Sequence, residues 1–200
     1  MKVVLDASVR KVIPELEVFY KVIQVREISD DIGSLNLKAL DGLRLSRQEK
    51  ASYSKFREKF AESSLLAVER LKSYPTIKDL PVPDPLTGLI IKASYYTDIP
   101  ITVFSVDEFN SVEIRFSVKG EYLKTKNGST PIKPHSIIAV TEKDILGILG
   151  IRSSYLGKLK PDSQEVAVLS FGCSQITSIK SKELLLQTIT QLQTKLGEKK

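Results

Sequence analysis

The sequence has few of the residues from which common metal and nucleophile sites are built. It contains one cysteine, Cys173, and one histidine, His135. A single cysteine forms no internal disulfide, and this pair cannot supply a Cys/His zinc set or a two-histidine metal site. We therefore expect no metal and no cofactor. Cys173 and His135 are far apart in the sequence, and no motif indicates that the fold brings them together as a nucleophile pair. We therefore expect Cys173 to be a small buried thiol.

Long apolar runs and nucleotide-binding motifs are also missing. Residues 1–7 lack the apolar region of a signal peptide, and the apolar stretch 88–91 is far shorter than the ~20 residues of a membrane span. No Gly-x-Ser-x-Gly elbow is present, and the glycines do not have the spacing of a Walker loop or a dinucleotide fingerprint. We expect a cytoplasmic protein without a membrane partner.

Positive charge is in excess. Thirty Lys and Arg against 24 Asp and Glu give a net charge of +6 and a pI near 9.2, a balance that favours polyanionic partners. Four lysines flank Tyr122, and we predict that they contact a nucleic-acid backbone while tyrosines offer stacking surfaces. These lysines are Lys119, Lys124, Lys126 and Lys133. The alternative is a solvated surface that keeps the chain soluble.

The apolar pattern predicts an α+β fold. Apolar residues recur at helical spacing over 46–74, 86–97 and 181–196, and Asp84 and Pro85 are suited to begin the second of these helices. Turn-bounded segments rich in β-branched residues predict a mainly antiparallel sheet or sandwich. These expected strands are 16–28, 99–104, 112–118, 121–124, 137–141, 145–151 and 165–171. The first is apolar on both faces, which predicts a central strand.

The proline-rich segment 76–85 is the only plausible internal boundary. We expect one domain over 1–200, with a strand and helices in 1–75 and the core region with the C-terminal helix in 82–200. Asn127 and Gly128 are expected to form a tight turn rather than a glycosylation site. His135 lies in a proline-bounded loop, where a surface position is expected and a general-base role is the alternative.

An ordered set of short motifs occupies residues 84–172. In order they are Asp84-Pro85-Leu86, Ile99-Pro100-Ile101, Val106-Asp107-Glu108-Phe109, Val112-Glu113-Ile114-Arg115, Gly120-Glu121, residues 137–140 and residues 147–152. This order resembles the B3/4 domain, the tRNA-editing module of the phenylalanyl-tRNA synthetase beta subunit, which also occurs as a free-standing small protein. Residues 9–25 are similar to the entry of the free-standing versions. The resemblance implies a three-layer α+β unit with a β-sandwich core and flanking helices.

The resemblance also implies tRNA or aminoacyl-tRNA as partner. In the editing modules a His on the proline-containing strand lines the site where mischarged tyrosyl-tRNA is hydrolysed, and Thr102 stands at that position here. A Glu late in those modules recognises the tyrosine hydroxyl, and Leu169 or Ser170 is the matching residue. Both recognition groups are absent, so no residue is assigned as catalytic. Hydrolysis would then rely on positioned water and backbone donors.

A substrate pocket is expected where small residues follow a strand. Gly147 and Gly150 allow close approach of a ligand, and Arg152 can hold a phosphate or carboxylate through parallel hydrogen bonds. Glu121, which follows a glycine, could hold an ammonium group. The full candidate set is Ser94, Thr102, Arg115, Glu121, Gly147, Gly150 and Arg152. The alternatives are a hairpin turn at Glu121, a solvated bend at Arg152, and an exposed ion pair between Arg115 and Glu113.

Two functions follow from these observations. The first is a free-standing B3/4-domain protein that binds tRNA or aminoacyl-tRNA and could hydrolyse a mischarged aminoacyl-tRNA in trans. The second is a non-catalytic small-ligand or protein-binding module on the same fold. The basic balance favours the first, and the absent recognition groups favour the second.

Overall fold

The computed structural model describes residues 1–25, 35–57, 71–80, 84–107, 109–148, 152–153, 157–160 and 162–194. The helices are α1 (Ala7–Val12), α2 (Arg47–Arg57), α4 (Pro85–Thr97) and α5 (Gln175–Thr194), with 3₁₀ helices η2 (Leu37–Leu43) and η3 (Ile77–Asp79). The strands are β1 (Lys2–Leu5), β2 (Glu17–Gln24), β3 (Ile101–Ser105), β4 (Ser111–Phe116), β5 (Tyr122–Thr125), β6 (Gly128–Pro131), β7 (Ile137–Val140), β8 (Ile145–Ile148), β9 (Arg152–Ser153) and β10 (Glu165–Gly172). The chain is therefore mixed α+β, as the sequence predicts.

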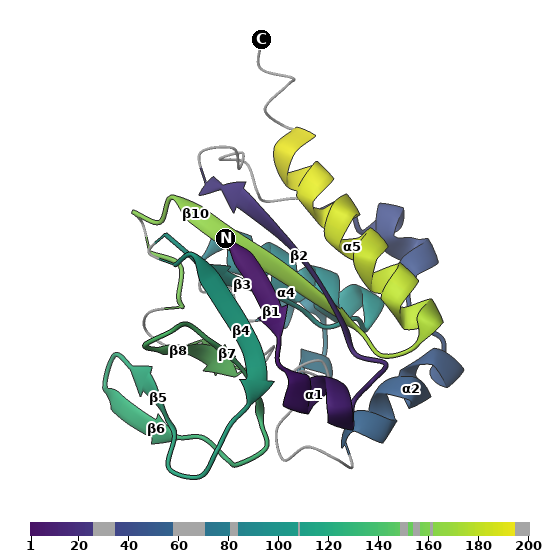
Figure 1. The fold of residues 1–200 in the computed structure, drawn as a ribbon. Coiled ribbons are helices and arrows are strands. Elements are labelled where there is room, and N and C mark those ends of the chain that lie inside the picture. The colour runs from purple at the N-terminus through teal and green to yellow at the C-terminus, as the bar shows by residue number, and fades with distance from the viewer. Residues whose placement is uncertain are drawn as a thin grey trace.

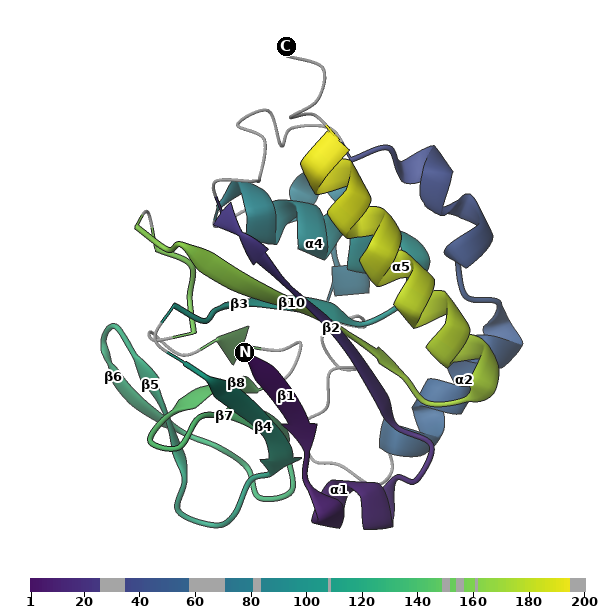
Figure 2. The ribbon, with the colours of Figure 1, turned by 45° about the horizontal axis from the view of Figure 1, so that its top comes forward.

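The strands form three sheets. A five-stranded sheet has the order β1-β4-β7-β8-β9, a three-stranded sheet has the order β2-β10-β3, and β5 pairs with β6 (Figure 1). Among the described strands, β1 and β4 run parallel and the other pairs are antiparallel. Helices α4 and α5 lie on one side of the three-stranded sheet and the five-stranded sheet lies on the other (Figure 2).

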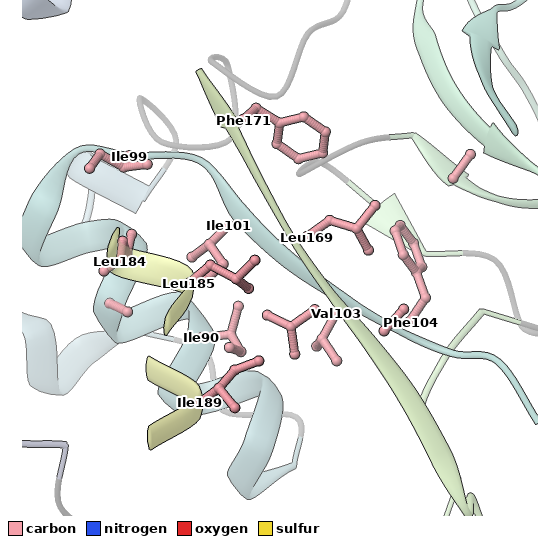
Figure 3. Close-up of a cluster of buried hydrophobic side chains, with 14 of the residues drawn as sticks. Ile90, Ile99, Ile101, Val103, Phe104, Leu169, Phe171, Leu184, Leu185 and Ile189 are labelled. Carbon is pink, nitrogen blue, oxygen red and sulfur yellow. The ribbon is translucent and has the colours of Figure 1, made fainter. Parts of the chain in front are cut away.

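The three-stranded sheet carries buried apolar side chains on both faces. Phe104, Leu169 and Phe171 project from one face, toward the five-stranded sheet (Figure 3). Ile101 and Val103 project from the other, where they meet side chains of the helices. Those helical residues are Ile90, Leu184, Leu185 and Ile189. Each element of this sheet thus belongs to one apolar cluster that also takes in residues of η2 and α2.

Strand β2 is an edge strand, which corrects the expected central position. It pairs with β10 alone among the described strands, and Tyr20 and Lys21 on it are exposed. Its two apolar faces have another cause. Helix α5 contacts β2, and Val18 and Val22 on one face and Phe19 on the other are half-buried against the main apolar cluster. An edge strand covered on both faces has the same apolar pattern as a central one.

Helix α4 begins where the sequence predicts. The Asp84 side chain accepts a hydrogen bond from the Thr87 N–H at 2.8 Å, and Pro85 occupies the first turn, where its missing N–H costs nothing. The expected helical stretch 46–74 contains α2, while its residues 58–70 lie outside the described residues. None of the described helices combines the length and apolar character that a membrane crossing needs.

Helix α5 starts at Gln175, six residues before the expected start at Ser181. The buried positions of its first turns are Thr177, Ser178 and Ser181 instead of apolar residues, so the apolar period does not reveal them. The Ser174 hydroxyl accepts a hydrogen bond from the Thr177 N–H at 3.3 Å and supports this helix start. Strands β1, β6 and β9 were not expected from the sequence.

Candidate nucleic-acid interface

The basic segment predicted to contact nucleic acid folds as the β5–β6 hairpin. A tight turn joins the strands as expected, but its two residues are Lys126 and Asn127, one position before the expected Asn127-Gly128 pair. Gly128 has φ of 125°, a backbone conformation open to glycine and rarely adopted by other residues. The hairpin therefore has a defined register, in which Tyr122 lies opposite Pro131 and Lys124 opposite Ser129.

One face of this hairpin is fixed to the five-stranded sheet. Leu123 and Ile132 are buried in a small apolar cluster with Ile138, Val140 and Ile148 of β7 and β8. Because neighbouring residues on a strand point to opposite faces, Tyr122 and Lys124 point outward. The hairpin is thus amphipathic, with an apolar face against the sheet and a polar face toward solvent.

The outward side carries the predicted basic residues. We define the hairpin face as the exposed residues Lys119, Tyr122, Lys124, Lys126 and Lys133. Lys124 forms an ion pair with Asp144, with 2.6 Å between Nζ and Oδ1. Exposed pairs of this kind contribute about 0–1 kcal/mol, so a phosphate can replace the aspartate. His135 is exposed in the loop after Lys133, as expected, with φ of 63°.

A charged clamp holds the turn that precedes β5. The two terminal guanidinium nitrogens of Arg115 donate to the Glu121 carboxylate, Nη1 to Oε2 at 3.2 Å and Nη2 to Oε1 at 2.5 Å. Nη1 also donates to the Phe116 carbonyl at 2.8 Å. Glu121 Oε2 accepts a further bond from the Val118 N–H at 2.8 Å. The partner of Arg115 is therefore Glu121 and not Glu113, which corrects the expected pair.

Two effects act in opposite directions on the Glu121 carboxyl group. Burial favours its neutral form, while the hydrogen bonds from Arg115 and from the Val118 N–H favour the carboxylate. The hydrogen bonds prevail and hold the pKa of Glu121 below its ordinary value. Glu121 is thus ionised and engaged by Arg115 at neutral pH. Its placement makes it a structural element of the hairpin face.

Several residues of the candidate substrate pocket fall on adjacent rows of the five-stranded sheet. Register pairs place Arg115 opposite Ile138, Ile138 opposite Ile148, and Ile148 opposite the Arg152 backbone. Gly147 lies on the next row, between Ala139 and Ser153. Gly150 lies outside the described residues. Arg115 and Arg152 thus occupy the two ends of one cross-strand row.

Ser94 and Thr102 lie away from that row. Ser94 is buried on α4, and its Oγ donates to the Ile99 carbonyl at 2.9 Å. Thr102 is half-buried on β3, opposite Leu169. Helix α4 and the hairpin lie on opposite sides of the three-stranded sheet (Figure 2). The structure thus joins Arg115 to Glu121 and leaves Ser94 in a separate layer.

The two positions that the resemblance aligned with the recognition Glu of the editing modules are enclosed. Leu169 and Ser170 are 1% and 0% exposed, and the Ser170 hydroxyl donates to the Pro100 carbonyl at 3.2 Å. Cys173 is buried, as expected, and burial raises the pKa of its thiol to about 11. A thiol that stays protonated is a poor nucleophile. In the described part of the chain, no three His, Cys, Asp or Glu residues gather as metal ligands would.

Sequence reasoning missed one charged cluster. Asp98 follows α4 with φ of 64° and is 9% exposed. Its carboxylate forms ion pairs with Lys50 Nζ at 2.5 Å and with Lys72 Nζ at 3.0 Å. Lys72 also lies over the Tyr95 ring at 4.2 Å. The cluster joins α2, the segment at residue 72 and the end of α4. An aspartate directly after a helix was the only sequence signal for it.

Comparisons with known proteins support the fold. No protein-family model and no curated protein matches the sequence. The structure is similar to an N-terminal fragment of the phenylalanyl-tRNA synthetase beta-subunit from Pyrococcus horikoshii, with a TM-score of 0.52 and 11% identity. The match covers 96% of this chain and 48% of the fragment, so the chain spans about half of its length. At this identity the likeness concerns the fold alone.

Proposed function

We propose that this chain is a relative of the B3/4 editing module and binds tRNA or aminoacyl-tRNA through its hairpin face. The observation that carries the proposal is the arrangement of four exposed lysines on and beside a hairpin whose other face is anchored to the sheet. The fold likeness to a tRNA synthetase subunit supports tRNA as the candidate among the polyanions that such a surface would attract.

The hairpin face suits a phosphate backbone better than a compact anion. Lys119 and Lys133 lie at the base of the hairpin, while Lys124 lies along β5 and Lys126 at its tip. Charges spread along an extended ribbon match charges spread along a polynucleotide, and each contact releases condensed counterions. Binding through this face should therefore weaken steeply as salt rises.

Deacylation is the activity to measure beside binding. Thr102 stands at the position of the family's His, and Leu169 and Ser170 are enclosed, so these positions supply no general base. Hydrolysis of a mischarged ester would depend on a positioned water and backbone donors. Incubation with a panel of correctly and incorrectly charged tRNAs distinguishes a deacylase from a protein that only binds.

The salt dependence of tRNA affinity tests the proposal. Replacing Lys124 and Lys126 together with alanine should reduce the slope of log affinity against log salt by about 1.4 to 1.8, because each lost phosphate contact removes about 0.7 to 0.9. Fluorescence anisotropy with labelled tRNA between 50 and 200 mM salt, the range over which such contacts weaken by several orders of magnitude, measures this slope.

Lys38→Ala with Lys182→Ala is the matched control. Both lysines are exposed, on η2 and α5, and the pair removes the same charge away from the hairpin. We expect its slope to equal that of the unmodified protein. Equal slopes for the two double variants would place binding elsewhere, and no binding at low salt would contradict the proposal.

A further inference from the structure

Tyr122 is the most exposed of the described tyrosines. Its side chain is 54% exposed. Tyr53 is buried, and its hydroxyl donates a hydrogen bond to the Phe171 carbonyl. Lys72 lies over the Tyr95 ring, and Arg44 lies over the Tyr96 ring. Within the described residues, Tyr122 has neither a side-chain hydrogen bond nor a ring contact. Its ring is open to a ligand.

The backbone that carries this ring is held on both sides. Glu121, the preceding residue, is clamped by Arg115, and its carbonyl accepts a hydrogen bond from the Ile132 N–H at 2.9 Å. Leu123, the following residue, is 1% exposed in the apolar cluster under the hairpin. Little conformational freedom is left for a ligand to remove, and such preorganisation strengthens binding.

Lysines flank the ring along the hairpin. Tyr122 and Lys124 share the outward row and stand about 7 Å apart along the strand, at about 3.4 Å per residue. Lys133 lies two residues beyond Pro131, the cross-strand partner of Tyr122. A base stacked on the ring would therefore have cations on both sides for its neighbouring phosphates. Aromatic platforms between cations are typical of proteins that bind single strands.

We propose that the hairpin face binds an unpaired RNA segment, with one base stacked on Tyr122 and the flanking phosphates on the lysines. The inference rests on the proposed function and specifies which part of an RNA is bound. In a duplex each base is already stacked between its neighbours, so its face cannot reach a protein ring. Lysine contacts alone would make no such distinction, because paired and unpaired backbones both carry phosphates.

The test compares two RNA probes at one salt concentration. One is a single-stranded oligonucleotide of about eight nucleotides, within the site size of known single-strand binders. The other is the same sequence paired with its complement. Anisotropy titration should show the unmodified protein binding the single strand at least tenfold more tightly. Tyr122→Ala should weaken single-strand binding about tenfold, from stacking worth about 1–3 kcal/mol per base, and bring the ratio of affinities toward one.

Two variants separate stacking from other effects. Tyr122→Phe keeps the ring and should retain the preference for the single strand, whereas Tyr74→Ala removes an exposed tyrosine elsewhere and should leave both affinities unchanged. Circular dichroism confirms that each variant is folded. Equal affinity of the unmodified protein for both probes, or an unchanged ratio in Tyr122→Ala, would overturn the inference while leaving RNA binding established. Absence of binding to either probe and to tRNA would overturn the proposed function with it.

Discussion

Replacing Gly172 with alanine is expected to lower the free energy of unfolding by about 3 kcal/mol, the upper part of the range for overpacked sites. A Cβ at this position would lie 2.3 Å from the Ser178 Cα and 2.6 Å from its backbone nitrogen. These atoms belong to the first turns of α5, so relief requires that the helix move off β10. Domain stability is only about 5–15 kcal/mol, so this loss is a large fraction of it.

Urea denaturation followed by circular dichroism measures the loss for Gly172→Ala. Gly42→Ala is the matched control, because nothing lies within 4 Å of a Cβ at Gly42 in η2. We expect that control to change the free energy by less than about 0.5 kcal/mol. Equal values for the two variants would show that α5 does not pack on Gly172 as described.

Glu121→Gln is expected to lower the free energy of unfolding by about 2 kcal/mol at neutral pH. The substitution leaves Arg115 without its carboxylate partner while the side chains at this site stay largely covered, with 27% exposure for Arg115 and 19% for Glu121. Hydrogen bonds to charged groups contribute about 1.5–3 kcal/mol. Chemical denaturation of both proteins at pH 7 gives the difference.

The same pair predicts a dependence on pH. The pKa of Glu121 in the folded protein lies below its ordinary value of 4.5, so folding favours the ionised form. That contribution is fully present above pH 4.5 and is lost as pH falls through the lower folded pKa. The stability difference between the unmodified protein and Glu121→Gln should therefore be constant near neutrality and shrink below pH 4.5. A difference that grows on acidification would contradict the clamp.

The sequence predicted those parts of the fold that depend on interactions between residues close together in the chain. Asp84 and Pro85 marked the start of α4, because capping depends on residues within one turn. The turn at Asn127 followed from the same kind of short-range preference. The start of α5 was missed because its buried first turns consist of Thr177, Ser178 and Ser181, and polar residues at buried positions leave no apolar period in the sequence.

In the candidate site, too, the sequence predicted features that depend on local residue type and missed those that depend on the folded chain. The lysines around Tyr122 could be found from composition and spacing, since exposure of charged residues is the default. The pairing of Arg115 with Glu121 could not, because it depends on how the chain turns between β4 and β5. The edge position of β2 was hidden for a related reason, since Val18, Phe19 and Val22 pack against the apolar cluster from both faces and give an edge strand the pattern of a central one.

Lysine-reactive footprinting with and without tRNA tests the central claim most directly. The reagent modifies exposed amines, and mass spectrometry reads the protection of each lysine. Binding through the hairpin face predicts that tRNA protects Lys119, Lys124, Lys126 and Lys133 and leaves Lys38 and Lys182 reactive. Protection confined to the helical side, or no protection at saturating tRNA, would contradict it.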